Sequence, residues 1–159
     1  MEKNPTAKKK FGDPREMVGV ALCIAERKHR NQFDRDGFPH LFHSMRLANQ
    51  APTPFLRALA LLHDVPEDCT PDGEDRAITM KGLFIAYEWP DDMYLALVAI
   101  TRQEEEKYEE YIKRVSGDDN ARLVKILDLR DNLTRSVPPL ERHKKRYEAA
   151  LSFLTSVPL

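Results

Sequence analysis

One short segment in the middle of the chain places four imidazole and carboxylate side chains directly behind an apolar run. It reads Leu61-Leu62-His63-Asp64-Val65-Pro66-Glu67-Asp68. Charged groups packed against a buried stretch cost free energy unless another charge compensates them. A divalent cation would supply that compensation, so the segment predicts a metal site.

Two residues far from this segment complete a candidate ligand set. His43 precedes it, and Asp128 follows it within the run 124–132. The expected ligands are two imidazoles and two carboxylates: His43, His63, Asp64 and Asp128. This mixture of nitrogen and oxygen donors suits Mn²⁺, Fe²⁺, Zn²⁺ or Mg²⁺ and does not select one of them. The chain has 2 cysteines, which excludes an all-thiolate structural zinc site.

Glu67 and Asp68 follow the expected ligands so closely that we interpret them as a catalytic pair. A bound cation lowers the pKa of water from about 15.7 toward about 7. One carboxylate would then orient the resulting hydroxide, and the other would transfer its proton. The simpler interpretation is an acidic loop that caps a following helix. The remaining histidines have no such neighbours, and we expect them at the surface or in loops: His29, His40 and His143.

Helical spacing of apolar residues dominates the chain, and no strand pair or internal repeat is evident. The pattern predicts an all-α fold of about seven helices in one compact domain. Thr53 and Pro54 are a typical helix start, and the apolar run at 55–63 predicts a buried helix. Pro66 should break this helix at Val65, just after the His-Asp pair. Other expected helices include 78–87, 104–115, 121–137 and 140–154.

The helix expected at 121–137 carries a narrow polar stripe. Lys125, Asp128, Asn132 and Arg135 fall within about 80° of one another at helical spacing. The opposite apolar side is broad, which predicts a central helix whose polar stripe lines a cleft.

The bulk composition limits the classes of partner. The chain has 159 residues, 25 Lys and Arg, and 26 Asp and Glu, for a net charge of −1. This balance argues against nucleic-acid or membrane binding. Cys23 and Cys69 do not form a CxxC pair, and no signal or membrane-spanning run is visible, so we expect a cytoplasmic protein.

The two ends of the chain lead to separate expectations. Residues 1–12 read as a flexible basic tail, and 13–159 as the domain. The last expected helix could pack on its own chain or mediate a homo-oligomer through its apolar residues: Tyr147, Ala150, Leu151 and Leu154.

The candidate site residues and the residues around them, in their order along the chain, resemble the HD superfamily of metal-dependent phosphohydrolases. They most closely resemble the hydrolase domain of RelA/SpoT-type proteins. The resemblance covers about residues 17–137 and rests on four motifs: His29-x-x-Gln32 with Gly37-x-Pro39-x-x-x-His43; Leu61-Leu62-His63-Asp64-x-x-Glu67-Asp68; Ile100-Thr101-Arg102 with Glu106-x-Tyr108-x-x-Tyr111-Ile112; and Val124-Lys125-x-x-Asp128-x-x-x-Asn132. The family removes the 3′-pyrophosphate of guanosine 3′,5′-bis(diphosphate), usually with Mn²⁺.

The resemblance implies roles for individual residues. His43, His63, Asp64 and Asp128 match the metal ligands, and Glu67 with Asp68 matches the acidic catalytic pair. The implied substrate-binding residues are Arg35, Lys125 and Asn132. The expected activity is hydrolysis of the alarmone to GDP and pyrophosphate by a metal-bound hydroxide, with Mn²⁺ as the cofactor and a small nucleotide as the partner.

The chain departs from the family pattern where positive charge would face the substrate. Asp34 stands where a second basic residue is common, and Leu129 follows the last ligand in place of arginine. Two alternatives therefore stay open. One is a phosphohydrolase for another nucleotide, such as a deoxynucleotide or an NADPH-like dinucleotide. The other is an inactive nucleotide-binding module.

Overall fold

The computed structural model describes residues 8–72 and 74–158, and within them the chain is almost entirely helical. These residues form eight helices of 8 to 16 residues and one helix of 4 residues. The prediction of an all-α fold is confirmed, and the described part of the chain contains isolated β-bridges only. The helices are α1 (Pro14–Lys28), α2 (Leu41–Gln50), α3 (Pro54–Leu62), α4 (Val65–Asp68), α5 (Arg76–Leu83), α6 (Asp91–Ile100), α7 (Tyr108–Val115), α8 (Asp119–Thr134) and α9 (Glu141–Ser156).

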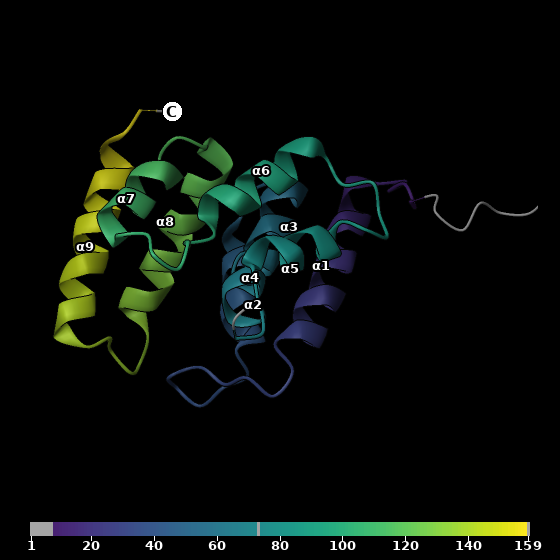
Figure 1. The fold of residues 1–159 in the computed structure, drawn as a ribbon. Coiled ribbons are helices and arrows are strands. Elements are labelled where there is room, and N and C mark those ends of the chain that lie inside the picture. The colour runs from purple at the N-terminus through teal and green to yellow at the C-terminus, as the bar shows by residue number, and fades with distance from the viewer. Residues whose placement is uncertain (1–7, 73, 159) are drawn as a thin grey trace, which may run out of the picture.

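Helix α3 lies at the centre of the N-terminal side of the fold. It packs against α1, α2, α6 and α8, and six of its nine residues are buried, as its apolar sequence predicts. Figure 1 shows α7, α8 and α9 gathered at one end of the molecule and α1 to α5 toward the other. Helix α8 contacts α2, α3 and α6 on one side and α7 and α9 on the other. It therefore joins the two ends, and the buried side chains of both form one hydrophobic cluster.

The ends of α3 follow the predicted signals closely. The hydroxyl of Thr53 accepts a hydrogen bond from the backbone N–H of Leu56 at 3.2 Å, and Pro54 occupies the first turn. The helix ends at Leu62, and a new single-turn helix begins at Val65. The break thus lies at His63 and Asp64, directly before the expected position at Val65. Pro66 fits the start of the new helix, because a helix needs no backbone donor from its first turn.

Three other predicted helices have different bounds in the structure. Asp75 caps α5 by accepting from the N–H of Ala77 at 2.8 Å, so this helix starts at Arg76, and it ends at Leu83 instead of residue 87. Residues 104–107 are not helical, because the carboxylate of Glu106 is held by Arg114. Helix α8 ends at Thr134, and Arg135 is extended.

Both ends of the described chain are attached to the helices. Residues 1–7 of the predicted tail lie outside the described residues. Within its remainder, the N–H of Lys9 donates to Ala86 O at 2.9 Å, and the ring of Phe11 stacks on Tyr87 at 5.2 Å. At the other end, Ala150 and Leu154 of α9 are buried, so this face packs on its own chain.

The described residues include no helix that is long and apolar enough to cross a membrane.

Arg114 is the main polar link between α6 and α7. Its Nη1 donates to the carbonyl oxygens of Val98 and Ala99, each at 2.8 Å, and its Nη2 donates to Thr101 O at 2.9 Å. The carboxylate of Glu106 lies 2.7 Å from Nη2. The guanidinium therefore caps the last carbonyl groups of α6, which have no partner within the helix.

Replacing Arg114 with Met should lower the free energy of unfolding by about 2 to 3 kcal/mol, because the variant leaves these carbonyl groups without the guanidinium donor and leaves Glu106 with only the N–H of Gln103. Urea denaturation of the purified protein measures the change. Lys113→Met on the exposed side of the same helix is the control and should change stability by less than about 0.5 kcal/mol. Equal losses in both variants would contradict the capping role.

Candidate metal centre

Three helices bring the predicted metal ligands together in the interior. His43 comes from α2, His63 and Asp64 follow the end of α3, and Asp128 lies on α8. His43, His63 and Asp128 are buried, and each places one possible ligand atom within 4.8 Å of the others. Asp64 adjoins them, with Oδ1 3.0 Å from His63 Nε2 and Oδ2 3.7 Å from His43 Nε2. This buried cluster could hold a metal ion.

Hydrogen bonds behind the two histidines fix how the rings face. Nδ1 of His43 lies 2.7 Å from Asp131 Oδ2, and Asp131 is itself held by Arg46 at 2.7 and 2.9 Å. Nδ1 of His63 lies 2.7 Å from the carbonyl oxygen of Ala60. Metal-binding histidines characteristically use the second ring nitrogen in this way, which leaves the first nitrogen facing the ion.

The donor atoms themselves fit a cation. Nε2 of His63 is buried and, although Asp64 Oδ1 lies 3.0 Å away, it makes no hydrogen bond within the described part of the chain. A buried polar nitrogen without a partner is costly, and a bound cation removes that cost. Together with a second imidazole and the carboxylates, this orphaned atom gives a nitrogen and oxygen donor set of the kind that Mn²⁺, Fe²⁺ or Zn²⁺ accepts.

Charges in the cluster are strongly interdependent. Burial alone would lower the pKa of His43, but the carboxylates of Asp128 and Asp131 outweigh burial and raise the pKa to about 10. Burial would raise the pKa of Asp128, yet Lys125 and the histidines hold the pKa of this carboxyl far below its usual range. The pKa of Asp64 is also lowered, against burial, by His63 and its neighbours. Both aspartates are therefore anionic at neutral pH, as metal ligands must be.

Glu67 and Asp68 behave differently from the ligand carboxylates. Burial raises the pKa of Glu67, although this carboxylate accepts a hydrogen bond from the N–H of Arg102 at 2.6 Å. Burial and the nearby charge of Asp64 also raise the pKa of Asp68. Neighbouring carboxyl groups whose pKa values are pushed apart are typical of sites that separate ligand and proton-transfer roles.

The residues expected to bind substrate lie around Asp128. Lys125 Nζ is 2.7 Å from Asp128 Oδ2, and Asn132 Nδ2 is 2.6 Å from Oδ1, so both hold the ligand carboxylate. Arg35 is exposed and donates to the carbonyl oxygen of Asn132 at 3.1 Å. Arg135, which the helical stripe was expected to include, lies beyond the end of α8 and pairs with Asp36 instead.

The structure places His29 and His40 outside the helices, in agreement with the expected loop positions, but close to the candidate site. His29 is only 3% exposed, so it is not a surface residue. His40 does lie in the predicted loop, but its Nε2 is 3.1 Å from Asp64 Oδ2. The loop folds back onto α4, where Gln32 donates to Asp68 O at 3.0 Å. The spacing of His40 and His43, which places both near one face at the start of α2, was the available signal.

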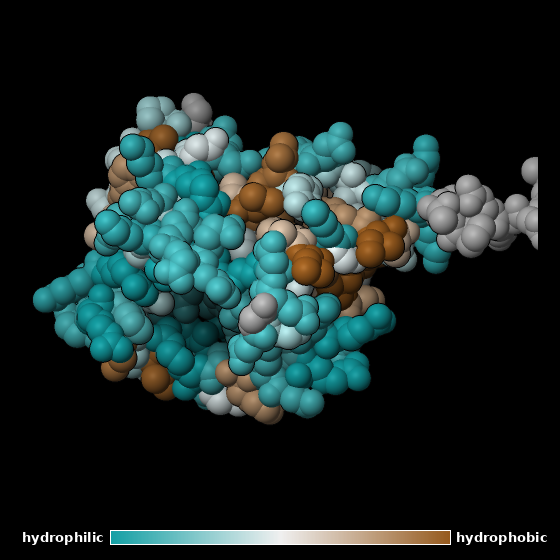
Figure 2. All heavy atoms as spheres, in the orientation of Figure 1, coloured by the Kyte–Doolittle hydropathy of each residue, from teal (hydrophilic) through white to brown (hydrophobic). Residues whose placement is uncertain are grey.

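The space-filling view shows a hollow with a hydrophilic lining between the end formed by α8 and α9 and the opposite end of the molecule (Figure 2). In the matching ribbon view, this hollow lies between α8 and the region of α2 and α4 (Figure 1). The side chains of the candidate metal cluster come from α2, from α8 and from the two residues between α3 and α4.

No protein-family model matches the chain, and no curated protein matches it.

A cation that binds this cluster should stabilise the fold. Mn²⁺ at about 100 times its dissociation constant should add about 2.7 kcal/mol to the free energy of unfolding. For a chain of this length, that corresponds to a rise in melting temperature of about 5 to 10 °C. Differential scanning calorimetry with Mn²⁺ and with a chelator measures the shift. Asp128→Asn, which keeps the size of the side chain, should lose most of it. An equal shift in the variant would show that Mn²⁺ binds elsewhere.

Asp131 should increase the metal affinity of the cluster without contacting the cation. Asp131→Asn keeps a hydrogen-bond acceptor for His43 but removes the negative charge that increases the basicity of the ring. We expect a loss of metal affinity of about 10- to 100-fold, measured by isothermal titration with Mn²⁺. Asp118→Asn at the start of α8 is the matched control and should leave the affinity unchanged. Unchanged affinity in Asp131→Asn would contradict the orienting role.

Proposed function

We propose that this protein is a metal-dependent phosphohydrolase that removes the 3′-pyrophosphate of guanosine 3′,5′-bis(diphosphate), giving GDP and pyrophosphate. The observation that carries the proposal is the convergence of buried His43, His63 and Asp128, with Asp64 beside them and Glu67 nearby. The order of these residues along the chain also resembles the HD superfamily. Mn²⁺ is the proposed cofactor, since it accepts this donor set and is usual in the resembled family.

A divalent cation held at this site would lower the pKa of a nearby water molecule and would act as a Lewis acid toward a phosphoryl oxygen. Neighbouring residues of the chain hold the proposed ligand side chains in position. His43 and His63 are fixed by Asp131 and Ala60, and Lys125 and Asn132 hold Asp128. Such prior positioning reduces the reorganisation needed when charge develops at the phosphorus.

Glu67 is the proposed group for proton transfer. Its raised pKa brings it closer to neutral pH than the ligand carboxylates, and general acid–base catalysis works best under that condition. The backbone N–H of Arg102 fixes one oxygen of Glu67 at 2.6 Å. The other oxygen could then accept a proton from the attacking water and pass it to the leaving group, which is the 3′-oxygen of GDP when the bond between that oxygen and phosphorus breaks.

One observation favours a second candidate substrate. Arg135, just beyond the end of α8, pairs with Asp34 and Asp36, so its positive charge is already compensated within the chain. Arg35 is the exposed base that contacts Asn132 at the edge of the cluster. A less highly charged nucleotide, such as a deoxynucleotide or an NADPH-like dinucleotide, would need fewer such contacts. The cleavage chemistry and the roles of the ligands would be the same.

The cellular setting of the proposal is cytoplasmic. Cys23 and Cys69 are both free thiols in the structure, which is consistent with a reducing compartment.

The activity is tested by incubating the purified protein with guanosine 3′,5′-bis(diphosphate) and Mn²⁺, and separating the products by anion-exchange chromatography. We expect GDP and pyrophosphate only when metal is present. Glu67→Gln should reduce kcat by about 10²- to 10⁴-fold with unchanged metal content. Glu74→Gln, in the exposed loop that follows, is the control and should retain full activity.

A panel containing deoxynucleoside monophosphates and NADPH distinguishes the two candidate substrates. Release of phosphate from one of these, with none from the guanosine compound, would favour the second candidate. Metal binding without hydrolysis of any member would contradict an enzymatic function. Full activity of Glu67→Gln would contradict the proposed proton transfer.

A further inference from the structure

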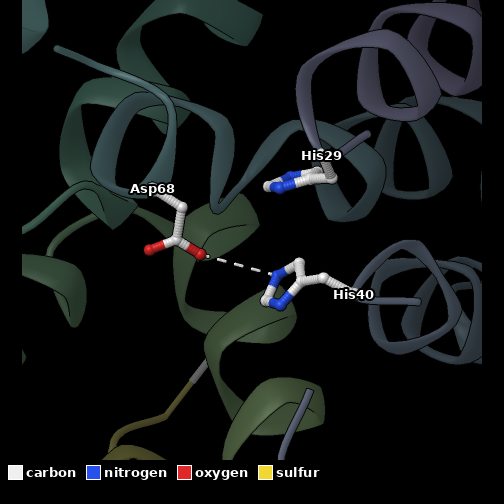
Figure 3. A group of neighbouring side chains, drawn as sticks. All are labelled: His29, His40 and Asp68. Atoms are coloured by element: carbon white, nitrogen blue, oxygen red, sulfur yellow. Dashed lines mark ion pairs between the residues drawn. The ribbon is translucent and has the colours of Figure 1, made fainter. Parts of the chain in front are cut away.

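A second group of metal-binding side chains lies beside the first. His29 follows the last residue of α1, His40 precedes the first residue of α2, and Asp68 ends α4. Each offers one possible ligand atom within 4.8 Å of the others. Figure 3 shows the two imidazoles and the carboxylate gathered around a common space, with His40 paired to Asp68. His29 is buried, whereas the Asp68 side chain is 44% exposed, so the group opens toward solvent on the Asp68 side.

His29 is held in the orientation that a ligand needs. Its Nδ1 lies 2.7 Å from Gln32 Oε1, and the amide nitrogen of Gln32 donates to Asp68 O at 3.0 Å. Because the amide oxygen only accepts, Nδ1 carries the hydrogen and Nε2 presents its lone pair. Nε2 is buried and lacks a hydrogen-bond partner among residues 8–72 and 74–158. The first cluster has a similar pattern at His63, where one ring nitrogen is hydrogen-bonded and the other is buried without a hydrogen bond, although Asp64 Oδ1 lies 3.0 Å from it.

Asp64 stands between the two groups. Its Oδ1 is 3.0 Å from Nε2 of His63 in the first cluster, and its Oδ2 is 3.1 Å from Nε2 of His40 in the second. One carboxylate can therefore give one oxygen to each group. Carboxylates placed in this way bridge pairs of cations that lie about 3.5 to 4 Å apart in two-metal hydrolytic sites.

We propose that the chain binds a second divalent cation through His29, His40 and Asp68, with Asp64 shared between the two cations. Two imidazoles and two carboxylates form a donor set that suits Mn²⁺, Fe²⁺ or Zn²⁺. The second cation changes the role of Asp68 from proton transfer to metal binding. Glu67, which belongs to neither group of ligands, then remains the residue for the proton. The proposal concerns metal binding and does not depend on which phosphate ester is the substrate.

Counting Mn²⁺ ions per chain tests the proposal directly. The purified protein is dialysed to equilibrium against Mn²⁺, and the bound metal is measured by inductively coupled plasma mass spectrometry. We expect two ions in the wild type and one in both His40→Gln and Asp68→Asn. His143→Gln, on α9, is the matched histidine control and should bind two ions. Circular dichroism establishes whether each variant is folded. If one of the two variants does not fold, the ion count of the other still tests the proposal.

The spectrum of the bound metal gives a second measurement. Two Mn²⁺ ions that share Asp64 should give the electron paramagnetic resonance signal of a spin-coupled pair, and His40→Gln should give that of an isolated ion. One ion in the wild type and an unchanged count in His40→Gln would overturn the second site and leave the first intact. Two ions retained in Asp68→Asn would also overturn the proposed ligand set. A wild type that binds no Mn²⁺ would overturn both sites.

Discussion

Compensation of buried carboxylates is the constraint on which this structure depends. Asp128 and Asp131 both project from α8 into the interior, and His43 of α2 meets both, with Nε2 3.1 Å from Asp128 and Nδ1 2.7 Å from Asp131. Removing one partner of a buried charge pair typically costs about 3 to 5 kcal/mol. The groups that could bind a cation are thus the same groups that join α2 to α8. Metal binding and the association of the two ends of the fold are therefore energetically coupled.

His63, Asp64 and Asp128 could be predicted because each of them stands in a strong local pattern, whereas His43 was included only as a partner for them. The apolar run of α3 shows where the buried helix ends, and the Thr53-Pro54 pair shows where it starts. The polar stripe of α8 carries Lys125, Asp128 and Asn132 at helical spacing, and the structure directs all three into the interior. In these places the periodic signal and the tertiary packing agree, so the all-α fold followed from the sequence as well.

The second group was missed because its position depends on contacts that no local pattern reveals. Residues 30–40 form a turn around Asp34 and Gly37, where Asp34 Oδ1 accepts from the N–H of Phe38 at 3.0 Å and Gly37 has a φ of 80°. The turn itself was visible in the sequence, but the helix against which it docks was not. Docking rests on Gln32 and Asp68, which are 36 residues apart. The incorrect bounds of α7 have a similar origin, because Glu106 leaves the helix to bind Arg114.

The single turn of α4 explains how one short segment can serve two groups of ligands. Asp64 and Asp68 are one helical turn apart, and the N–H of Asp68 donates to Asp64 O at 2.9 Å, so both carboxylates approach His40. Glu67, one residue earlier than Asp68, is turned about 100° around the helix axis and meets Arg102 instead. Pro66 favours this geometry because its fixed φ restarts the helix immediately after the break. The helical spacing of Asp64 and Asp68, with Glu67 on another side of the same turn, is therefore what separates the metal-facing carboxylates from the one available for proton transfer.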